Sequence, residues 1–322
     1  MSTVAAPLRG RRRIGDRIGD TSLYALTAVA AVGVVVLLGA IAYKVFDGAS
    51  VSFSKFGLGF VGERDWNPVT GHFGALTFIY GTAVTSAIAL LLAAPLAIGI
   101  GLFLSELAPR YVRDVIGALV EMLAAIPSVI LGLWGILVLG PWVQSDLEPA
   151  LHSVFGFVPL FDGDTNASGI LPAALILTIM VVPIVASVSR ELFLSVPSEL
   201  EEGALALGAT RWEMVLGVVL PYTRPGLVAA VILGLGRALG EAIAVSLVIG
   251  SVFGARGIHT SLFGAGNTLG AGIANEYQSA TSPLEVSSLV YLAAILLVIS
   301  LIVNVAARLV VRRFEFQHAG GS

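Results

Sequence analysis

SELEEGALALGATRWEMVLGVVLP, residues 198–221, is a polar segment set between two long apolar runs. Ser198 with Glu201, and Thr210 with Glu213, each have the spacing of a capping box. In that motif the hydroxyl and the carboxylate side chains bond reciprocally to the backbone at the start of a helix. The segment therefore predicts two helix starts within one short stretch.

Gly208 lies between the two boxes. Glycine accepts the left-handed conformation that ends many helices, so we expect a helix, a tight turn and a second helix, with Pro221 closing the unit. Two short helices bent at a glycine form a compact knob, which is suited to docking a partner protein.

The composition excludes a soluble globule. The chain has 322 residues, of which 57% are hydrophobic and 12% are charged, and its mean hydropathy is +0.93. This leaves too little polar surface to cover a folded domain of this size in water. The chain has no cysteine, and its four histidines lack the spacing of metal ligands, so the sequence predicts neither disulfides nor a metal site.

Several apolar runs reach the roughly 20 residues that a helix needs to cross a bilayer. The first could instead be a signal peptide, since Ala40-Ile41-Ala42 resembles a cleavage site, but its length favours a retained helix. We expect an ordered external loop over 46–72, a loop over 144–168 and a Gly-rich loop over 254–283. The six expected spans are 23–43, 74–104, 115–143, 169–188, 226–253 and 284–311.

Basic residues are distributed unevenly between the links that join these spans. Because Lys and Arg mark cytoplasmic links, both termini and the 198–221 knob are expected in the cytoplasm. The predicted fold class is an all-α integral membrane protein with six transmembrane helices. Lys44, Lys55, Arg64 and Arg256 fall on the opposite side, whereas the expected cytoplasmic side holds Arg9, Arg11, Arg12, Arg13, Arg17, Arg110, Arg113, Arg190, Arg211, Arg224, Arg308, Arg312 and Arg313.

The sequence contains no signature of catalysis. A P-loop needs a Gly-Lys-Ser/Thr sequence to hold phosphates, and the only lysines, Lys44 and Lys55, lie in other contexts. Neither a Gly-x-Ser-x-Gly elbow nor an HExxH motif occurs. We therefore predict a membrane subunit that is not an enzyme and binds no cofactor of its own.

The fifth expected span carries two charged residues, Arg237 and Glu241, in the sequence GLGRALGEAIAV. An ionisable group at mid-bilayer costs roughly 2.5–3.5 kcal/mol or more, and a spacing of four places both on one helical face. They could form an ion pair that only neutralises itself, or Arg237 could contact a passing oxyanion while Glu241 holds and partly neutralises it. Gly236 and Gly240 would let a neighbouring helix approach closely.

Glu121 and Ser128 are weaker candidates for the same path. Glu121 lies only about two turns into the third span, so it could also reach water or Arg113. Ser128 belongs to AAIPSVILGLWG, whose proline and small residues favour a kinked, closely packed helix.

The 198–221 segment resembles the EAA loop of bacterial ABC importer permeases. That loop has the pattern EAA, three residues, Gly, nine residues, Ile, one residue, Leu-Pro; this chain departs from it at Gly203 and Val218 with the spacing intact. The resemblance implies the type I permease fold of ABC importers, with a cytoplasmic coupling helix that docks into an ATPase. The residues implied in coupling are Glu202, Gly203, Ala204, Gly208, Leu220 and Pro221.

Further stretches are similar to the permeases of the phosphate-specific ABC importer, and AIAVSLVIG is more similar to the C-type subunits (PstC) than to the A-type (PstA). The resemblance implies that Arg237 and Glu241 correspond to charged residues implicated in phosphate passage. It implies as partners a sister permease PstA, a dimer of the ATPase PstB that uses ATP and Mg²⁺, and the phosphate-binding protein PstS, in a bacterial inner membrane. The similar stretches are 73–86, 121–135, 236–250 and 268–276.

These expectations divide the chain into a basic tail (1–22), the first span with its external loop (23–72), a permease core (73–311, with the coupling loop at 190–224) and a C-terminal tail (312–322). Three alternatives stay open: a permease for another oxyanion, the sister phosphate permease, and a secondary transporter. The last gives no reason for the EAA spacing.

Overall fold

A computed structural model describes residues 14–319 of the chain, so Arg9, Arg11, Arg12 and Arg13 of the predicted basic tail lie outside it. The chain divides into two units, Met1–Gly48 and Ala49–Ser322. Within the first, α1 (Ile14–Gly48) is a single helix whose Ser22–Gly48 portion is long and apolar enough to cross a membrane. The first predicted span is therefore confirmed as helical.

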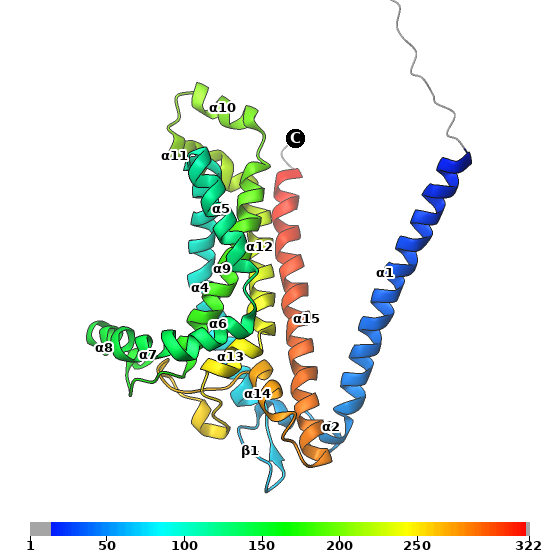
Figure 1. The fold of residues 1–322 in the computed structure, drawn as a ribbon, viewed down its shortest axis with the longest axis vertical. Helices are drawn as coiled ribbons and strands as arrows, with labels where there is room; N and C mark the ends of the chain where they lie inside the picture. The colour runs from blue at the N-terminus through cyan, green and yellow to red at the C-terminus, as the bar shows by residue number, and fades with distance from the viewer. Residues whose placement is uncertain (1–13, 320–322) are drawn as a thin grey trace, which may run out of the picture. The chain divides into compact units, whose positions relative to one another are not determined.

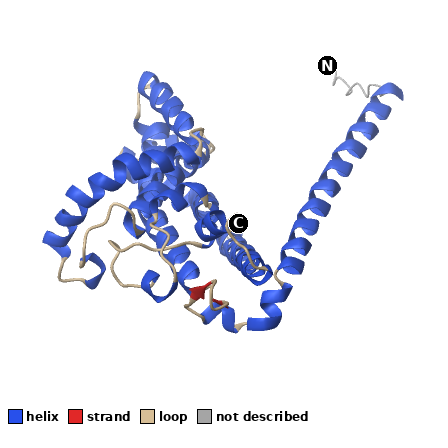
Figure 2. Cartoon of the chain, turned by 60° about the horizontal axis from the view of Figure 1, so that its bottom comes forward, coloured by secondary structure: helices blue, strands red, loops and turns tan. Residues whose placement is uncertain are grey.

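The second unit begins with an ordered segment, but the loop predicted over 46–72 is largely helical as far as Gly62. It contains α2 (Ser50–Phe56), α3 (Gly59–Gly62) and a hairpin in which β1 (Trp66–Asn67) pairs antiparallel with β2 (His72–Phe73). Phe60 stacks on Tyr291 with ring centroids 4.5 Å apart. Aromatic packing therefore holds this segment against the helices. Its hairpin is the only pair of strands among residues 14–319 (Figure 2).

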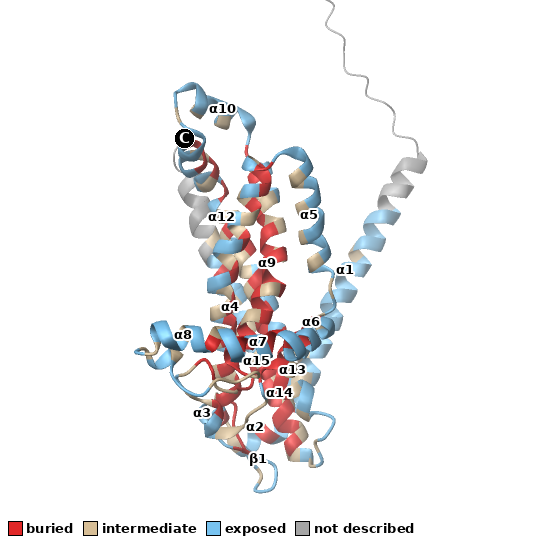
Figure 3. Ribbon diagram, turned by 60° about the vertical axis from the view of Figure 1, so that its left-hand side comes forward, coloured by how far each residue is buried: buried red, intermediate tan, exposed pale blue. Residues whose placement is uncertain are grey.

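The helical bundle is built around α9 (Ile170–Leu194), which is buried along most of its length (Figure 3). Helix α4 (Leu76–Leu102) runs along it and continues as the π turn η1 (Phe103–Leu107). The helices α12 (Leu220–Gly240) and α15 (Pro283–Ala319) complete this part of the bundle. One end of the unit carries α10 (Ser198–Ala206) and is called the α10 end; the other carries β1 and is called the hairpin end (Figure 1).

The prediction of one continuous third span over 115–143 is wrong, because the helix breaks in front of Pro127. Proline lacks an N–H and disfavours a helical residue before it, so α5 (Arg110–Ala124) ends and a new helical run starts at Ser128. This run crosses the bundle near the hairpin end (Figure 1). Its parts are α6 (Ser128–Trp134), η2 (Gly135–Leu139), α7 (Gly140–Trp142), η3 (Val143–Leu147) and α8 (Glu148–Phe155).

The predicted loop over 144–168 is also wrong in its first half, which is helical as far as Phe155. Glu148 is buried there, and its Oε2 accepts the N–H of Asn166 at 2.7 Å. The carboxylates of this stretch suggested a loop, whereas this contact folds the returning chain back onto the helix. A short turn, η4 (Pro159–Phe161), lies in the return.

The fifth span also differs from its predicted bounds of 226–253. Its helix runs from α11 (Arg211–Met214) through the π turn η5 (Val215–Val219) into α12 and stops at Gly240. Glu241 is extended (ψ 122°), and α13 (Ile243–Val248) follows. The predicted Gly-rich loop over 254–283 contains η6 (Gly254–Gly257) and α14 (Leu269–Glu276).

Six helical segments among the described residues are long and apolar enough to cross a membrane. The predicted class, an all-α integral membrane protein with six transmembrane helices, is therefore confirmed, although the third and fifth spans have different bounds. The six segments are Ser22–Gly48, Leu76–Leu107, Ser128–Phe155, Ile170–Leu194, Arg211–Gly240 and Pro283–Leu309.

Candidate functional site: a broken membrane helix and its coupling segment

The 198–221 segment forms the expected helix, turn and helix, with two corrections. The Thr210–Glu213 capping box is present, but the one predicted at Ser198 is not, because Pro197 occupies the N-cap and Ser198 is already helical. Gly208 adopts a φ of +91°, the left-handed turn expected of it.

Pro221 does not close the unit, which is the second correction. The helix that starts at Arg211 passes through η5 into α12 with no break, and Pro221 lies inside it, just after the π turn. The end of the coupling segment and the beginning of a membrane helix are therefore one continuous element.

The residues implied in coupling divide into exposed and packed ones. Glu202, Gly203, Gly208 and Pro221 are exposed. Ala204 and Leu220 are half-buried against a small core that anchors the segment to the bundle. That core consists of Phe193, Val196, Met214, Val215, Val219 and Leu227.

Large apolar side chains are exposed on the same segment. Leu200, Leu205, Leu207 and Trp212 all lie at the surface, and Leu207 is 92% exposed. Exposed apolar side chains of this kind are suited to an interaction site.

Arg237 and Glu241 form an ion pair at the end of α12, with Nη2 of the arginine 3.3 Å from Oε2 of the glutamate. The two groups differ in burial, because the Glu241 side chain is 5% exposed and that of Arg237 is 45% exposed. The other carboxylate oxygen of Glu241 accepts the N–H of Ala244 at 3.1 Å. The carboxylate is thus held from two sides, whereas the guanidinium retains donors that face outward.

Two glycines hold the break at Glu241 in place. A Cβ on Gly132 of α6 would lie 2.8 Å from the Cα of Ala244, and one on Gly270 of α14 would lie 3.0 Å from the carbonyl oxygen of Glu241. The first distance is shorter than real side chains show and the second is tighter than most of them, so α6 and α14 approach the broken segment at backbone distance.

Gly236 and Gly240 do not have the role predicted for them within this chain. A Cβ on either would meet no other atom within 4 Å among the described residues. The close helix contact is made instead at Gly234, where a Cβ would lie 2.8 Å from side-chain carbons of Val181 and Val185. The face of α12 that carries Gly236, Arg237 and Gly240 is therefore uncovered.

Ser128 is the first residue of α6 and is half-buried. Since α6 packs on α13, Ser128 belongs to an element that contacts the chain just beyond Glu241. Among the described residues no hydrogen bond joins its hydroxyl to the ion pair.

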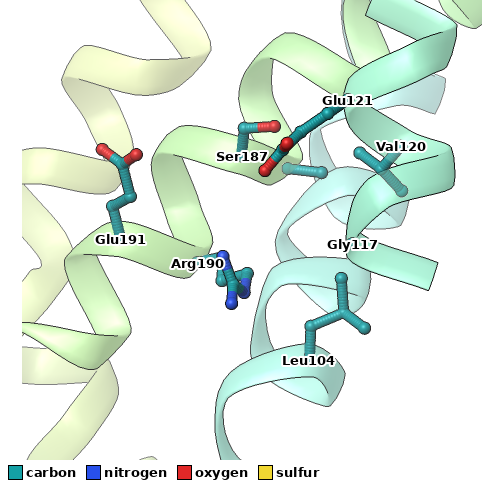
Figure 4. A pocket seen from close by; sticks show the side chains of 8 residues that line it. Leu104, Gly117, Val120, Glu121, Ser187, Arg190 and Glu191 are labelled. Atoms are coloured by element: carbon teal, nitrogen blue, oxygen red, sulfur yellow. The ribbon is translucent and has the colours of Figure 1, made fainter. Parts of the chain in front are cut away.

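Glu121 lies elsewhere, in a pocket between α5 and α9 near the α10 end (Figure 4). The pocket is small and partly open, and it is lined by side chains from α5, α9 and η1. Arg113, a partner considered for Glu121, donates instead to the carbonyl oxygen of Ser105. The lining residues are Leu104, Gly117, Val120, Glu121, Ala186, Ser187, Arg190 and Glu191.

Sequence reasoning missed Arg190 and Ser187 as members of a site. The fourth span was predicted to end at 188, which made Arg190 a residue of the cytoplasmic link. Helix α9 continues to Leu194 and is followed by Pro197. The absence of any helix breaker between Val188 and Pro197 was the signal that could have placed Arg190 on the helix.

Glu201 of α10 has a perturbed carboxyl group. Burial raises the pKa of Glu201 above its ordinary value, and the nearby carboxylates of Glu106 and Glu202 raise it further. The start of α10 therefore lies close to η1, where carboxylates repel one another.

Two relatives match nearly the whole chain. The phosphate transport system permease protein PstC of Mesorhizobium japonicum is 47% identical over 92% of this chain and 91% of its own length. The protein of the same name from Pasteurella multocida is 42% identical over 94% of this chain and 95% of its own length.

Two solved structures share the fold at low sequence identity. A bacterial ABC transporter involved in the import of the acidic polysaccharide alginate has a TM-score of 0.56 at 19% identity, covering 92% of this chain and 99% of its own. The inward-facing MetNI methionine ABC transporter has a TM-score of 0.53 at 21% identity, covering 74% of this chain and 96% of its own.

A family model described as the inner membrane component of binding-protein-dependent transport systems matches residues 97–316. This match runs from the end of α4 into α15 and includes the coupling segment and the broken helix. The chain belongs to the family of inner-membrane components of binding-protein-dependent transport systems.

Proposed function

We propose that the chain is the permease subunit of an ATP-driven importer and forms, with a sister permease, the membrane path for inorganic phosphate. The observation that carries the proposal is Arg237, a half-exposed cation on an uncovered face of a membrane helix. An arginine cannot shed its charge, so its retention within a span calls for a function. The names of the relatives support phosphate as the cargo.

The geometry of the pair suits transient anion binding. Glu241 is fixed by the Ala244 N–H and by one arm of Arg237, which leaves other guanidinium donors free for a bidentate contact with an oxyanion. The buried carboxylate also partly neutralises the arginine. A phosphate bound there is therefore held weakly enough to leave.

The uncovered face of α12 indicates where the path runs. Gly236 and Gly240 flank Arg237 and have open space above them in the single chain. A second permease subunit packed on this face would enclose Arg237 between the two subunits. By this proposal Glu241 and Ser128 contribute from the same region, and Glu121 contributes from the separate pocket near the α10 end.

The coupling segment connects this path to a cytoplasmic ATPase. The exposed Leu205, Leu207 and Trp212 beside Glu202 and Gly203 offer an apolar surface for docking. Closure of a PstB-type dimer on ATP and Mg²⁺ would move α10, and the continuous helix from Arg211 to Gly240 would carry the movement to Arg237. Alternating access would follow, with a PstS-type binding protein delivering phosphate to the hairpin end.

This assignment sets the orientation in the bacterial inner membrane. The α10 end, the basic tail (1–22) and the C-terminal tail (312–322) lie in the cytoplasm by this proposal, with the permease core at 73–311. Reporter fusions at the two termini and in the hairpin loop, near Val69, test it. A cytoplasmic signal from the hairpin fusion would contradict it.

Uptake of radiolabelled phosphate by the reconstituted four-component importer tests the function. We expect Arg237→Gln to abolish ATP-dependent uptake while the complex assembles normally. Arg110→Gln is the matched control, because Arg110 is an exposed arginine at the start of α5, away from the broken helix. Normal uptake by the Arg237→Gln complex would overturn the proposed role, and competition by sulfate equal to that by arsenate would overturn phosphate as the cargo.

A further inference from the structure

The pocket between α5 and α9 is separate from the Arg237–Glu241 pair. Arg190 lies one turn from the α10 end of α9, whereas Arg237 lies at the opposite end of α12, next to the break. Figure 4 shows the Arg190 guanidinium and the Glu121 carboxylate directed into the space between the two helices, with Ser187 beside Glu121. The carboxylate of Glu191 points away from that space.

Arg190 is a cation without a partner in the described part of the chain. Its side chain is half-buried, and its Nε is fully buried with no hydrogen-bond acceptor. No ion pair links it to a carboxylate among residues whose side chains are described. Since a partly desolvated guanidinium is costly unless its donors are satisfied, the pocket is suited to an anion.

The remaining lining groups restrict which anion fits. Ser187 and Arg190 are three residues apart and share one face of α9. Glu121 faces them from α5, and an ionised carboxylate can only accept hydrogen bonds. Gly117, one turn before Glu121, leaves the space open, because a Cβ there would meet no atom within 4 Å.

We propose that this pocket binds a phosphate group that carries a proton. Arg190 and Ser187 donate to its unprotonated oxygens, and Glu121 accepts the hydrogen bond from its P–OH. Sulfate has no such hydrogen at neutral pH, so it would place a bare oxygen against the Glu121 carboxylate and be rejected. The pocket would thus be a second binding site, selective for protonated oxyanions. Its role in transport rests on the proposed phosphate path.

The same chemistry is available from inorganic phosphate and from the phosphomonoester headgroup of a lipid. Equilibrium dialysis of radiolabelled inorganic phosphate against the detergent-solubilised complex of permeases and ATPase, prepared without the binding protein and in an Arg237→Gln background, separates the pocket from the ion-pair site. Binding of the same complex to phosphatidylcholine vesicles with and without phosphatidic acid tests the lipid. Binding of inorganic phosphate or of phosphatidic acid shows which of the two the pocket takes. If neither binds, the proposal is overturned.

The pocket variants are Arg190→Gln and Glu121→Gln. We expect each to weaken phosphate binding in the dialysis by about tenfold or more, the usual effect of removing one partner of a charged hydrogen bond. Glu121→Gln should also raise sulfate binding, because an amide can donate to a bare oxygen. Arg110→Gln and Asp114→Asn are the matched controls, since both residues are exposed on α5 outside the pocket lining.

The outcomes separate this inference from the proposed function. Unchanged phosphate and phosphatidic acid binding in both pocket variants would overturn the pocket, even if wild-type uptake is normal. Failure of the wild-type complex to import phosphate would overturn the proposed path, while the dialysis would still report whether the pocket binds. Unchanged sulfate binding in Glu121→Gln would overturn the role of Glu121 in selecting the proton.

Discussion

The chain places an arginine and a glutamate together twice, and the two sites are built differently. At the break after α12, Arg237 and Glu241 are paired at 3.3 Å, and the carboxylate is buried. Between α5 and α9, Arg190 and Glu121 line one pocket but form no ion pair. The first pair comes from the last turn of α12 and the residue that follows it, whereas the second is contributed by two helices.

The helix packing near the two sites also differs: it is close beside α12 and open between α5 and α9. Helix α9 meets α12 at Gly234 with no room for a methyl group, whereas it meets α5 at a pocket where Gly117 has open space. Arg237 and Glu241 are four residues apart on one stretch of backbone, so they stay close enough to satisfy each other. Charges on two loosely packed helices depend on what lies between them, and this makes the second site sensitive to a ligand or to a helix movement.

The largest expected difference comes from adding one methyl group at each contact. Gly234→Ala places a Cβ 2.8 Å from Val181 and Val185, so we expect a loss of about 1–3 kcal/mol from overpacking. Gly117→Ala meets no atom within 4 Å and should stabilise α5 by about 0.5–1 kcal/mol. Thermal unfolding of the two purified variants measures whether each substitution raises or lowers stability. Equal destabilisation by both would contradict the distinction between closed and open packing.

A double-mutant cycle compares the two charge pairs directly. For Arg237→Gln with Glu241→Gln we expect a coupling free energy of about 1 kcal/mol, limited by solvent because the arginine is 45% exposed. For Arg190→Gln with Glu121→Gln we expect a coupling of about zero in the absence of phosphate. The readout is the unfolding midpoint of each purified complex. Strong coupling between Arg190 and Glu121 without ligand would contradict the difference between the two sites.

The smallest effect concerns Glu201, beside the open end of the bundle. Because its pKa is raised in the folded state, its ionisation opposes folding: stability is highest below the ordinary pKa of 4.5 and falls as the pH rises through the raised value. We expect Glu201→Gln to stabilise the protein by a few tenths of a kcal/mol at pH 7, since the side chain is partly exposed. The variant should gain nothing at pH 4, and a gain that is independent of pH would contradict the electrostatic cause.

Sequence patterns predicted the elements that depend on local chemistry. The span count follows from hydropathy, the turn at Gly208 from its neighbours, and the Arg237–Glu241 contact from a spacing of four on one helix. Glu121 and Arg190 are 69 positions apart, and nothing local indicates that α5 and α9 bring them to one pocket. The early end of α12 at Gly240 was missed because the apolar run continues, and the close approach of α6 and α14 to the break is a tertiary contact that no local pattern indicates.

The π turn η5 sets the rotational phase of the transport helix. A π turn accommodates one residue more than an α turn, and each residue rotates an α-helix by about 100°. Arg237 thus points about 100° away from where an unbroken α-helix starting at Arg211 would aim it. Deleting one residue within Val215–Val219 leaves the guanidinium in place, whereas deleting one between Leu220 and Arg237 swings it off the uncovered face.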